Sequence, residues 1–76
     1  MTARPHDLLR AIADEVGETF DDSRENMDAL AEALNCRPRR VYTDLLALER
    51  LGLIAASYNG VRLQRRWRVT EQGKAA

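Results

Sequence analysis

The stretch that decides the fold is NCRPRRVYTDLLALERLGLI, residues 35–54. Its apolar residues recur every three or four positions, as on one buried face of an α-helix, at Val41, Leu45, Leu48 and Leu51. Proline is favoured in the first turn of a helix and glycine just past its end. The stretch therefore predicts a helix over about 38–51 that ends at Gly52 and packs on the rest of the chain through its leucine face.

Two amphipathic segments precede this helix. The first predicts a helix over about 5–16 with Gly17 as a left-handed stop. The second predicts a short helix capped by Asn26 and ended by Asn35, with an apolar face of Met27, Leu30, Ala31 and Leu34. The acidic, turn-rich segment between them contains Phe20, which we expect in the core. Only NCRP separates the second helix from the third, which is the spacing of a helix-turn-helix.

A β-hairpin is predicted downstream, over about 53–69. Asn-Gly between two strand-like segments is the strongest short signal for a two-residue type I′ turn. A turn at Asn59-Gly60 gives the pairs Tyr58 with Val61, Ala56 with Leu63 and Ile54 with Arg65. Alternation then places Trp67 on the inward face, and it separates Arg65 from three arginines on the other face, Arg62, Arg66 and Arg68. The tail TEQGKAA has the composition to start one more helical turn at Thr70.

The charges of the chain are strongly segregated although the formal net charge of its 76 residues is zero. Residues 1–36 hold three basic and nine acidic side chains, a net charge of −6, and residues 37–76 hold nine basic and three acidic ones, a net charge of +6. Eleven of the twelve cations are arginine, the residue suited to bidentate contacts with phosphate and guanine. This asymmetry favours nucleic-acid binding by the second half.

The order of elements and a specific set of residues resemble known regulators. Residues 29–54 resemble the DeoR-like and biotin-repressor-like helix-turn-helix pattern at Leu30, Ala31, Glu32, Leu34, Arg39, Val41, Tyr42, Asp44, Leu45, Ala47, Leu48, Glu49, Gly52, Leu53 and Ile54. The closing WRVTEQGKA is similar to the strand end of MarR- and PadR-type regulators. The expected fold is α+β, a single winged helix-turn-helix domain over 1–76 with three helices followed by a two-stranded β-hairpin wing. The resemblance implies that the third helix enters the DNA major groove and that the wing contacts the flanking backbone or minor groove.

The chain departs from that pattern in the turn before the third helix. Asn35 and Cys36 replace a glycine and a valine, and Arg37 and Arg40 replace the usual serine cap and the threonine that follows. Arginine cannot accept a hydrogen bond from the backbone N–H groups, so a cap that contributes about 1 kcal/mol is lost. We expect Arg37 and Arg40 to contact phosphate instead, and Cys36 to be a small buried residue of the turn.

The outward face of the third helix supplies the candidate base contacts. At about 100° per residue, Leu45 and Leu48 fall within about 40° of Val41, and the side opposite carries arginine, threonine and tyrosine. Arginine can bind guanine, and threonine can bond a base edge or touch a thymine methyl. The predicted DNA-binding residues are Arg37, Arg39, Arg40, Tyr42, Thr43, Arg50, Arg62, Arg65, Arg66 and Arg68.

Other interpretations of these charges stay open. The arginines are alternatively a solvated surface, partners of the acidic half, or charges that protect an exposed strand edge. A protein-interaction module that uses the acidic half is the main alternative function, and RNA or unusual DNA shape is a third. Homodimerisation on paired half-sites is an alternative to a monomer.

The remaining features argue against catalysis. The chain has no glycine-rich phosphate loop, no paired Cys or His and no nucleophile–base pair, so we expect no enzyme, cofactor, metal site or small-molecule substrate. There is no apolar stretch of the roughly 20 residues that span a bilayer, and the single cysteine fits a reducing compartment. We expect a cytoplasmic protein associated with the nucleoid, without membrane contact.

Overall fold

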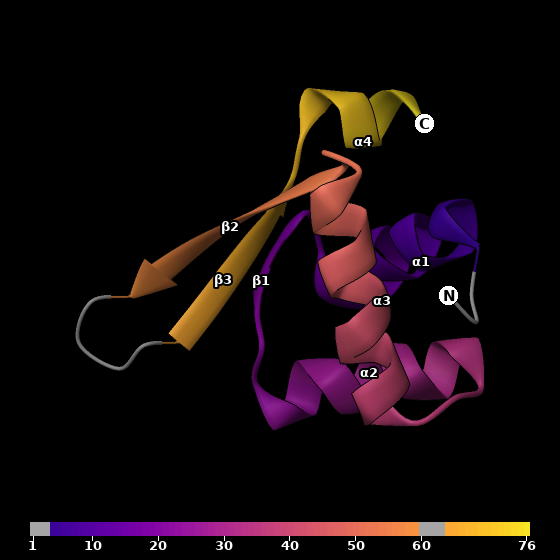
Figure 1. Ribbon diagram of the computed structural model, residues 1–76. Coiled ribbons are helices and arrows are strands. Elements are labelled where there is room, and N and C mark those ends of the chain that lie inside the picture. Colours follow the sequence, from indigo (N-terminus) through magenta and orange to yellow (C-terminus); the bar gives the residue numbers. More distant parts are fainter. Residues whose placement is uncertain (1–3, 60–63) are drawn as a thin grey trace.

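The computed structural model describes residues 4–59 and 64–76. Over these residues the chain is α+β, as predicted, with helices and an antiparallel sheet (Figure 1). The elements in chain order are α1 Pro5–Ala11, the π-helical η1 Ile12–Val16, β1 Thr19–Asp21, α2 Arg24–Leu34, α3 Pro38–Arg50, β2 Ile54–Asn59, β3 Gln64–Val69 and α4 Glu71–Ala75. No helix in this part of the chain has the length and apolar character that crossing a bilayer requires.

The first two helices match their predicted spans with two differences. The segment predicted as one helix over 5–16 is α1 continued by η1, and Gly17 ends it with a φ of 86°. The cap of α2 is Ser23 and not Asn26, because the Ser23 hydroxyl accepts a hydrogen bond from the Asn26 N–H at 3.3 Å. Asn35 takes the left-handed conformation predicted for it, with a φ of 53°.

The third helix, α3, packs through most of the predicted leucine face. Val41, Leu45 and Leu48 are fully buried. Leu51, also predicted in this stripe, is 53% exposed, since α3 ends at Arg50 and the chain turns through Gly52, whose φ is 77°. The turn places the next residue, Leu53, in the core instead.

The sheet has three strands in the described residues, one more than predicted. Its order is β1-β3-β2 and both pairs are antiparallel. The short strand β1 comes from the acidic segment predicted as a loop. Phe20 of β1 lies opposite Trp67 of β3 with 5.5 Å between ring centroids, so the predicted core position of Phe20 is confirmed.

The predicted hairpin register was wrong. Tyr58 pairs with Arg65 and Asn59 with Gln64, so β2 extends through Asn59 and the connection comprises residues 60–63, which lie outside the described residues. The shift is an even number of residues, so the predicted inward and outward faces of the strands are kept. The observed register places Trp67 opposite Ala56 and beside Phe20, where the indole is fully buried. Burial of this large side chain outweighs the local preference of Asn-Gly for a two-residue turn.

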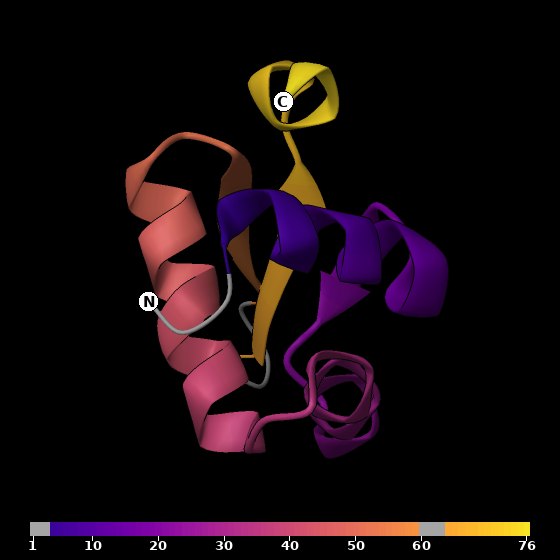
Figure 2. The same ribbon diagram turned by 90° about the vertical axis from the view of Figure 1, so that its right-hand side faces the viewer.

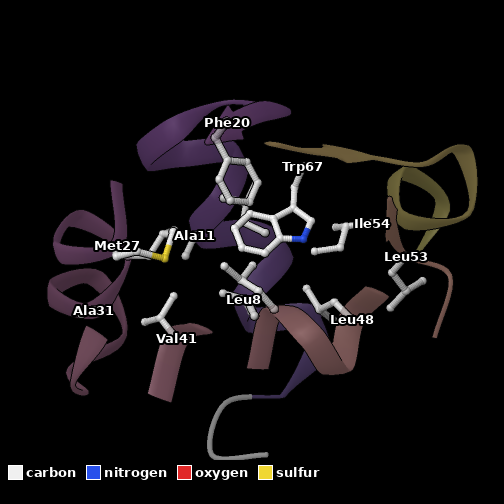
Figure 3. Close-up of a cluster of buried hydrophobic side chains, with 13 residues drawn as sticks. Leu8, Ala11, Phe20, Met27, Ala31, Val41, Leu48, Leu53, Ile54 and Trp67 are labelled. Atoms are coloured by element: carbon white, nitrogen blue, oxygen red, sulfur yellow. The ribbon is translucent and has the colours of Figure 1, made fainter. Parts of the chain in front are cut away.

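One hydrophobic core joins the helices to the inward face of the sheet (Figure 3). Its members are Leu8, Ala11, Ile12, Phe20, Met27, Leu30, Ala31, Val41, Leu45, Leu48, Leu53, Ile54 and Trp67. Figures 1 and 2 show α3 along one side of the domain, with α1 behind it in the first view and to its right in the second. One long face of α3 is therefore left uncovered by the other elements.

The helical turn predicted at Thr70 is present as α4. The Thr70 hydroxyl donates to the backbone oxygens of Gly52 and Leu53, at 2.7 and 3.0 Å, and accepts from the Gly73 N–H at 3.0 Å. Gly73 is buried against Leu53, so close that an added Cβ would lie 2.1 Å from the Leu53 oxygen. Through Thr70 and Gly73, the TEQG segment thus packs α4 against the turn between α3 and β2.

Candidate nucleic-acid interface

The uncovered face of α3 carries a stripe of polar side chains, which we call the outward stripe. It consists of Arg39, Thr43 and Arg50, all exposed. Helical spacing places them opposite the buried Val41 and Leu45. The Thr43 hydroxyl donates to the Arg39 backbone oxygen at 3.1 Å, which leaves the hydroxyl oxygen able to accept a hydrogen bond.

Three arginines gather at the N-terminus of α3. Arg37, Arg39 and Arg40, together with Thr43, border a shallow depression of about 290 Å³. Arg37 is the N-cap residue, in extended conformation, and its side chain makes no capping hydrogen bond. The first turn of α3 has no acidic residue to neutralise the positive end of the helix. The depression therefore combines guanidinium charge with the positive end of the helix dipole, and both favour an oxyanion.

The arginines of α3 make no ion pair within residues 4–59 and 64–76. The ion pairs found there join Arg24 to Asp28 at 3.8 Å and Lys74 to Glu18 and Glu71, at 3.3 and 3.6 Å. The acidic half of the chain therefore does not occupy these arginines, and the alternative in which the two halves pair internally finds no support at α3. The exposed carboxylates of the acidic half lie on or next to α1, η1 and α2, at Asp7, Asp14, Glu15, Glu18, Glu25, Asp28 and Glu32.

Tyr42 occupies a different side of α3 from the outward stripe. It is half-buried, and its ring meets Trp67 edge-on with 5.8 Å between centroids. It belongs to the contact between α3 and β3 more than to the exposed surface. Sequence spacing alone placed it among the outward residues because a helical wheel does not show where the neighbouring strand lies.

The hairpin arginines divide between the two faces of the sheet. Arg66 and Arg68 are exposed on the outward face, opposite Ser57 and Ala55 of β2. Arg65 is half-buried on the inward face, together with Trp67. This division is the predicted one. Arg62, the fourth predicted hairpin arginine, lies outside the described residues.

Arg66 also faces a carboxylate of β1. It pairs in register with Asp21, whose Oδ1 accepts hydrogen bonds from the Ser23 N–H at 3.1 Å and the Asn26 side chain at 2.9 Å. The hydrogen bonds from the Ser23 side chain and backbone, the nearby Arg66 charge and Asn26 together lower the pKa of the Asp21 carboxyl below its ordinary value. Part of the Arg66 charge is therefore balanced locally, whereas Arg68 lies opposite the uncharged Thr19.

Sequence patterns did not predict the inward roles of two polar side chains of α3, Asp44, which is buried, and Glu49, which is half-buried. Asp44 is 1% exposed on the edge of the leucine face, and Glu49 accepts a hydrogen bond from Trp67 Nε1 at 3.1 Å. The predicted buried character of Cys36 is borne out in part, since it is half-buried and packs against the core. Burial raises the pKa of its thiol, with the Asp44 carboxylate adding to the effect. A buried polar residue leaves no signal in apolar periodicity, because it interrupts the pattern that marks the face.

Comparison with known proteins assigns no family to the chain. No family model, curated protein or solved structure matches it. The functional conclusion therefore depends on the charge, exposure and placement of the chain's own side chains.

Proposed function

We propose that the chain is a winged helix-turn-helix domain that binds double-stranded DNA and regulates transcription in the cytoplasm. The observation that carries the proposal is the outward stripe of α3, in which Arg39, Thr43 and Arg50 are exposed and the two arginines have no carboxylate partner among the described residues. An α-helix fits the B-DNA major groove, where arginine binds guanine O6 and N7 and threonine binds a base edge.

The basic cluster at the start of α3 supports the same proposal. Arg37 and Arg40 border the depression at the helix N-terminus, which adjoins Arg39 and Thr43 of the outward stripe. A phosphate seated there would receive charge-assisted hydrogen bonds and the favourable end of the helix dipole. Phosphate contacts fix the register of a protein on the duplex, and base contacts then read sequence. In the proposed arrangement Arg37 and Arg40 hold the backbone while the outward stripe reads bases.

The β2–β3 hairpin is the proposed wing. Arg68, exposed on its outward face, is the described hairpin arginine that lies opposite an uncharged residue of β1. It is therefore the better candidate for a backbone contact, and Arg66 is the weaker one because Asp21 faces it. Such contacts add affinity without sequence preference.

A titration of labelled duplexes selected from a random library tests the function. Wild-type protein is expected to bind selected duplexes with an affinity that falls steeply as salt rises, since each phosphate contact contributes a slope of about −0.9. Arg39→Ala should weaken binding by about 1–3 kcal/mol and relax the preference at one base position. Arg10→Ala, which removes an exposed arginine from α1, is the matched control and should bind as wild type does. Absence of binding by wild type at low salt would contradict the proposal.

A protein-interaction module is the second candidate, and the placement of Glu15 favours it. Glu15 borders two adjoining depressions between the first helical segment and α2, one with Asp7 and Asp14, the other with Glu32. If this surface is the functional one, Glu15→Lys abolishes capture of a basic protein partner while wild type shows no affinity for duplex DNA. Competition among duplex DNA, single strands and RNA separates the nucleic-acid alternatives.

A further inference from the structure

The guanidinium of Arg65 lies among three aromatic rings from three elements. Its central carbon is 5.9 Å from the ring centroid of Tyr42 on α3, 5.2 Å from that of Tyr58 on β2 and 5.8 Å from that of Trp67 on β3. Arg65 also donates a hydrogen bond to the Tyr58 hydroxyl. We call these four residues the Arg65 cluster. It joins the hairpin to α3 at the point where the apolar core ends.

The strand pattern explains why an arginine occupies this place. Arg65 shares the inward face of β3 with Trp67, but Trp67 is fully buried and Arg65 is half-buried. Its cross-strand partner Tyr58 is 60% exposed, so this pair marks the outer limit of the core. A planar, weakly hydrated guanidinium can stack on aromatic rings at a partly solvent-exposed position. A lysine ammonium is more strongly hydrated and presents no flat face.

The charge of Arg65 is therefore engaged within the domain. The Tyr58 hydroxyl and, more weakly, the Glu49 carboxylate on α3 favour the charged form of the guanidinium, whose Nε is buried and makes no hydrogen bond among the described residues. Arg66, the next residue along β3, is exposed on the opposite face. Two adjacent arginines that are indistinguishable by charge thus have different surroundings.

We propose that Arg65 is a positioning residue, which fixes the β2–β3 hairpin against α3 and so sets where the hairpin lies relative to the outward stripe, and that it does not itself contact DNA phosphate. This inference rests on the proposed DNA-binding function. It removes Arg65 from the direct contacts expected from sequence and gives Tyr42 and Tyr58 a role as the surfaces that hold it.

The test compares Arg65→Ala, Arg65→Lys and the matched control Arg66→Ala by duplex titration over a range of salt concentrations. A positioning role predicts that Arg65→Ala weakens binding by about tenfold with an unchanged salt slope, because every phosphate contact is still made in the complex. Arg65→Lys should not restore affinity, since lysine keeps the charge and loses the stacking plane. A slope that falls by about 0.9 in Arg65→Ala, with recovery in Arg65→Lys, overturns the inference.

A second measurement needs no DNA. Trp67 is the one tryptophan of the chain and belongs to the Arg65 cluster, so its fluorescence reports on changes in that cluster. Arg65→Ala uncovers the indole and should make its emission more sensitive to acrylamide, while Arg66→Ala leaves it unchanged. Tyr58→Phe removes only the hydroxyl acceptor at an exposed position, and it should produce a smaller change of the same sign even where Arg65→Ala folds poorly. Equal quenching in all four proteins overturns the inference. Failure of wild type to bind DNA, with these fluorescence differences present, contradicts the proposed function and not the placement of Arg65.

Discussion

Trp67 on β3 donates a hydrogen bond from its indole Nε1 to the Glu49 Oε1 on α3, at 3.1 Å, while its ring is fully buried in the core. The contact joins the longest described helix to the central strand of the sheet. It also explains how a domain with a small core can bury a tryptophan, because a buried indole N–H needs an acceptor.

Removing this acceptor should destabilise the fold. Glu49→Ala leaves the indole N–H unsatisfied, and we expect the free energy of unfolding to fall by about 1–3 kcal/mol. Glu49→Gln keeps a side-chain oxygen within hydrogen-bond distance of the indole N–H, so its free energy of unfolding should fall by less. Urea unfolding followed by Trp67 fluorescence measures both, with Glu32→Ala at an exposed position of α2 as control. Equal stability of Glu49→Ala and the control would show that the hydrogen bond contributes nothing.

Gly73 is the second site where a small change should have a large effect. Its φ is not in the left-handed region, so alanine would suit the α4 backbone and add about 1 kcal/mol of helix propensity. The added Cβ, however, would lie 2.1 Å from the Leu53 backbone oxygen and 2.9 Å from a Val69 methyl. Backbone cannot move aside as a side chain can. The clash should therefore destabilise the fold by about 1–3 kcal/mol, more than the gain in helix propensity.

Thermal unfolding of Gly73→Ala measures this balance. We expect a lower midpoint than wild type, together with loss of protection of the Thr70 amide, whose N–H donates to the Leu53 oxygen. Ala75→Ser, at an exposed position of the same helix, is the control and should unfold as wild type does. A higher midpoint for Gly73→Ala would mean that the gain in helix propensity exceeds the cost of the clash. It would contradict the close approach of α4 to Leu53.

The helices could be predicted from sequence because their signals are local. The spacing of Val41, Leu45 and Leu48, the proline at the start of α3 and the glycine beyond its end lie within one stretch and agree with each other. The hairpin register could not be predicted in the same way. The Asn-Gly pair is a strong local signal, but the observed pairing is decided by where Trp67 and Phe20 meet across strands far apart in sequence.

The candidate site shows the same limit. The outward position of Arg39 and Arg50 follows from helical periodicity, which needs no knowledge of neighbouring elements. Alternation along β3 predicts that Arg65 and Arg66 lie on opposite faces of the sheet. It does not predict which side chains surround each arginine. The enclosure of Arg65 by Tyr42 and Tyr58 depends on how the hairpin packs on α3, a tertiary relationship that no pattern in either segment encodes.

Asp21 should make stability depend on pH at the acidic end. Hydrogen bonds from Ser23, the Arg66 charge and Asn26 lower its pKa below the ordinary value of 3.8. A carboxyl with a lowered folded-state pKa contributes stability that is fully present above the unfolded value and is lost as pH falls through the folded one. We therefore expect Asp21 to stabilise the protein at neutral pH and to lose its contribution below about pH 4.

Urea titrations of wild type and Asp21→Asn, at pH 7 and at pH 3, test this direction of the pH dependence. The difference in unfolding free energy between the two proteins should be larger at pH 7 and shrink at pH 3. Ala13→Ser, at an exposed uncharged position of η1, is the control and should show no such change. A difference that grows on acidification would contradict the placement of Asp21 as an acceptor for the start of α2.

Arg37 and Arg4 form a natural pair of matched positions. Each is the N-cap residue of a helix that continues with proline, each has extended backbone, and neither side chain makes a capping hydrogen bond. Arg37 borders the basic depression of α3, whereas Arg4 precedes α1 and is not among the residues that border it. The two sites therefore separate the effect of a missing cap from the effect of a missing phosphate contact.

Serine at either position should stabilise the fold, and only one of the two substitutions should affect DNA binding. Arg37→Ser and Arg4→Ser each supply an acceptor for the orphan N–H groups, and we expect each to raise the free energy of unfolding by about 1 kcal/mol in urea titrations. Arg37→Ser should also weaken duplex binding and reduce the salt slope by about 0.9, as one phosphate contact is lost. Arg4→Ser should leave both affinity and slope unchanged. If Arg37→Ser stabilises the protein without any change in affinity or slope, Arg37 makes no phosphate contact and its charge serves another purpose.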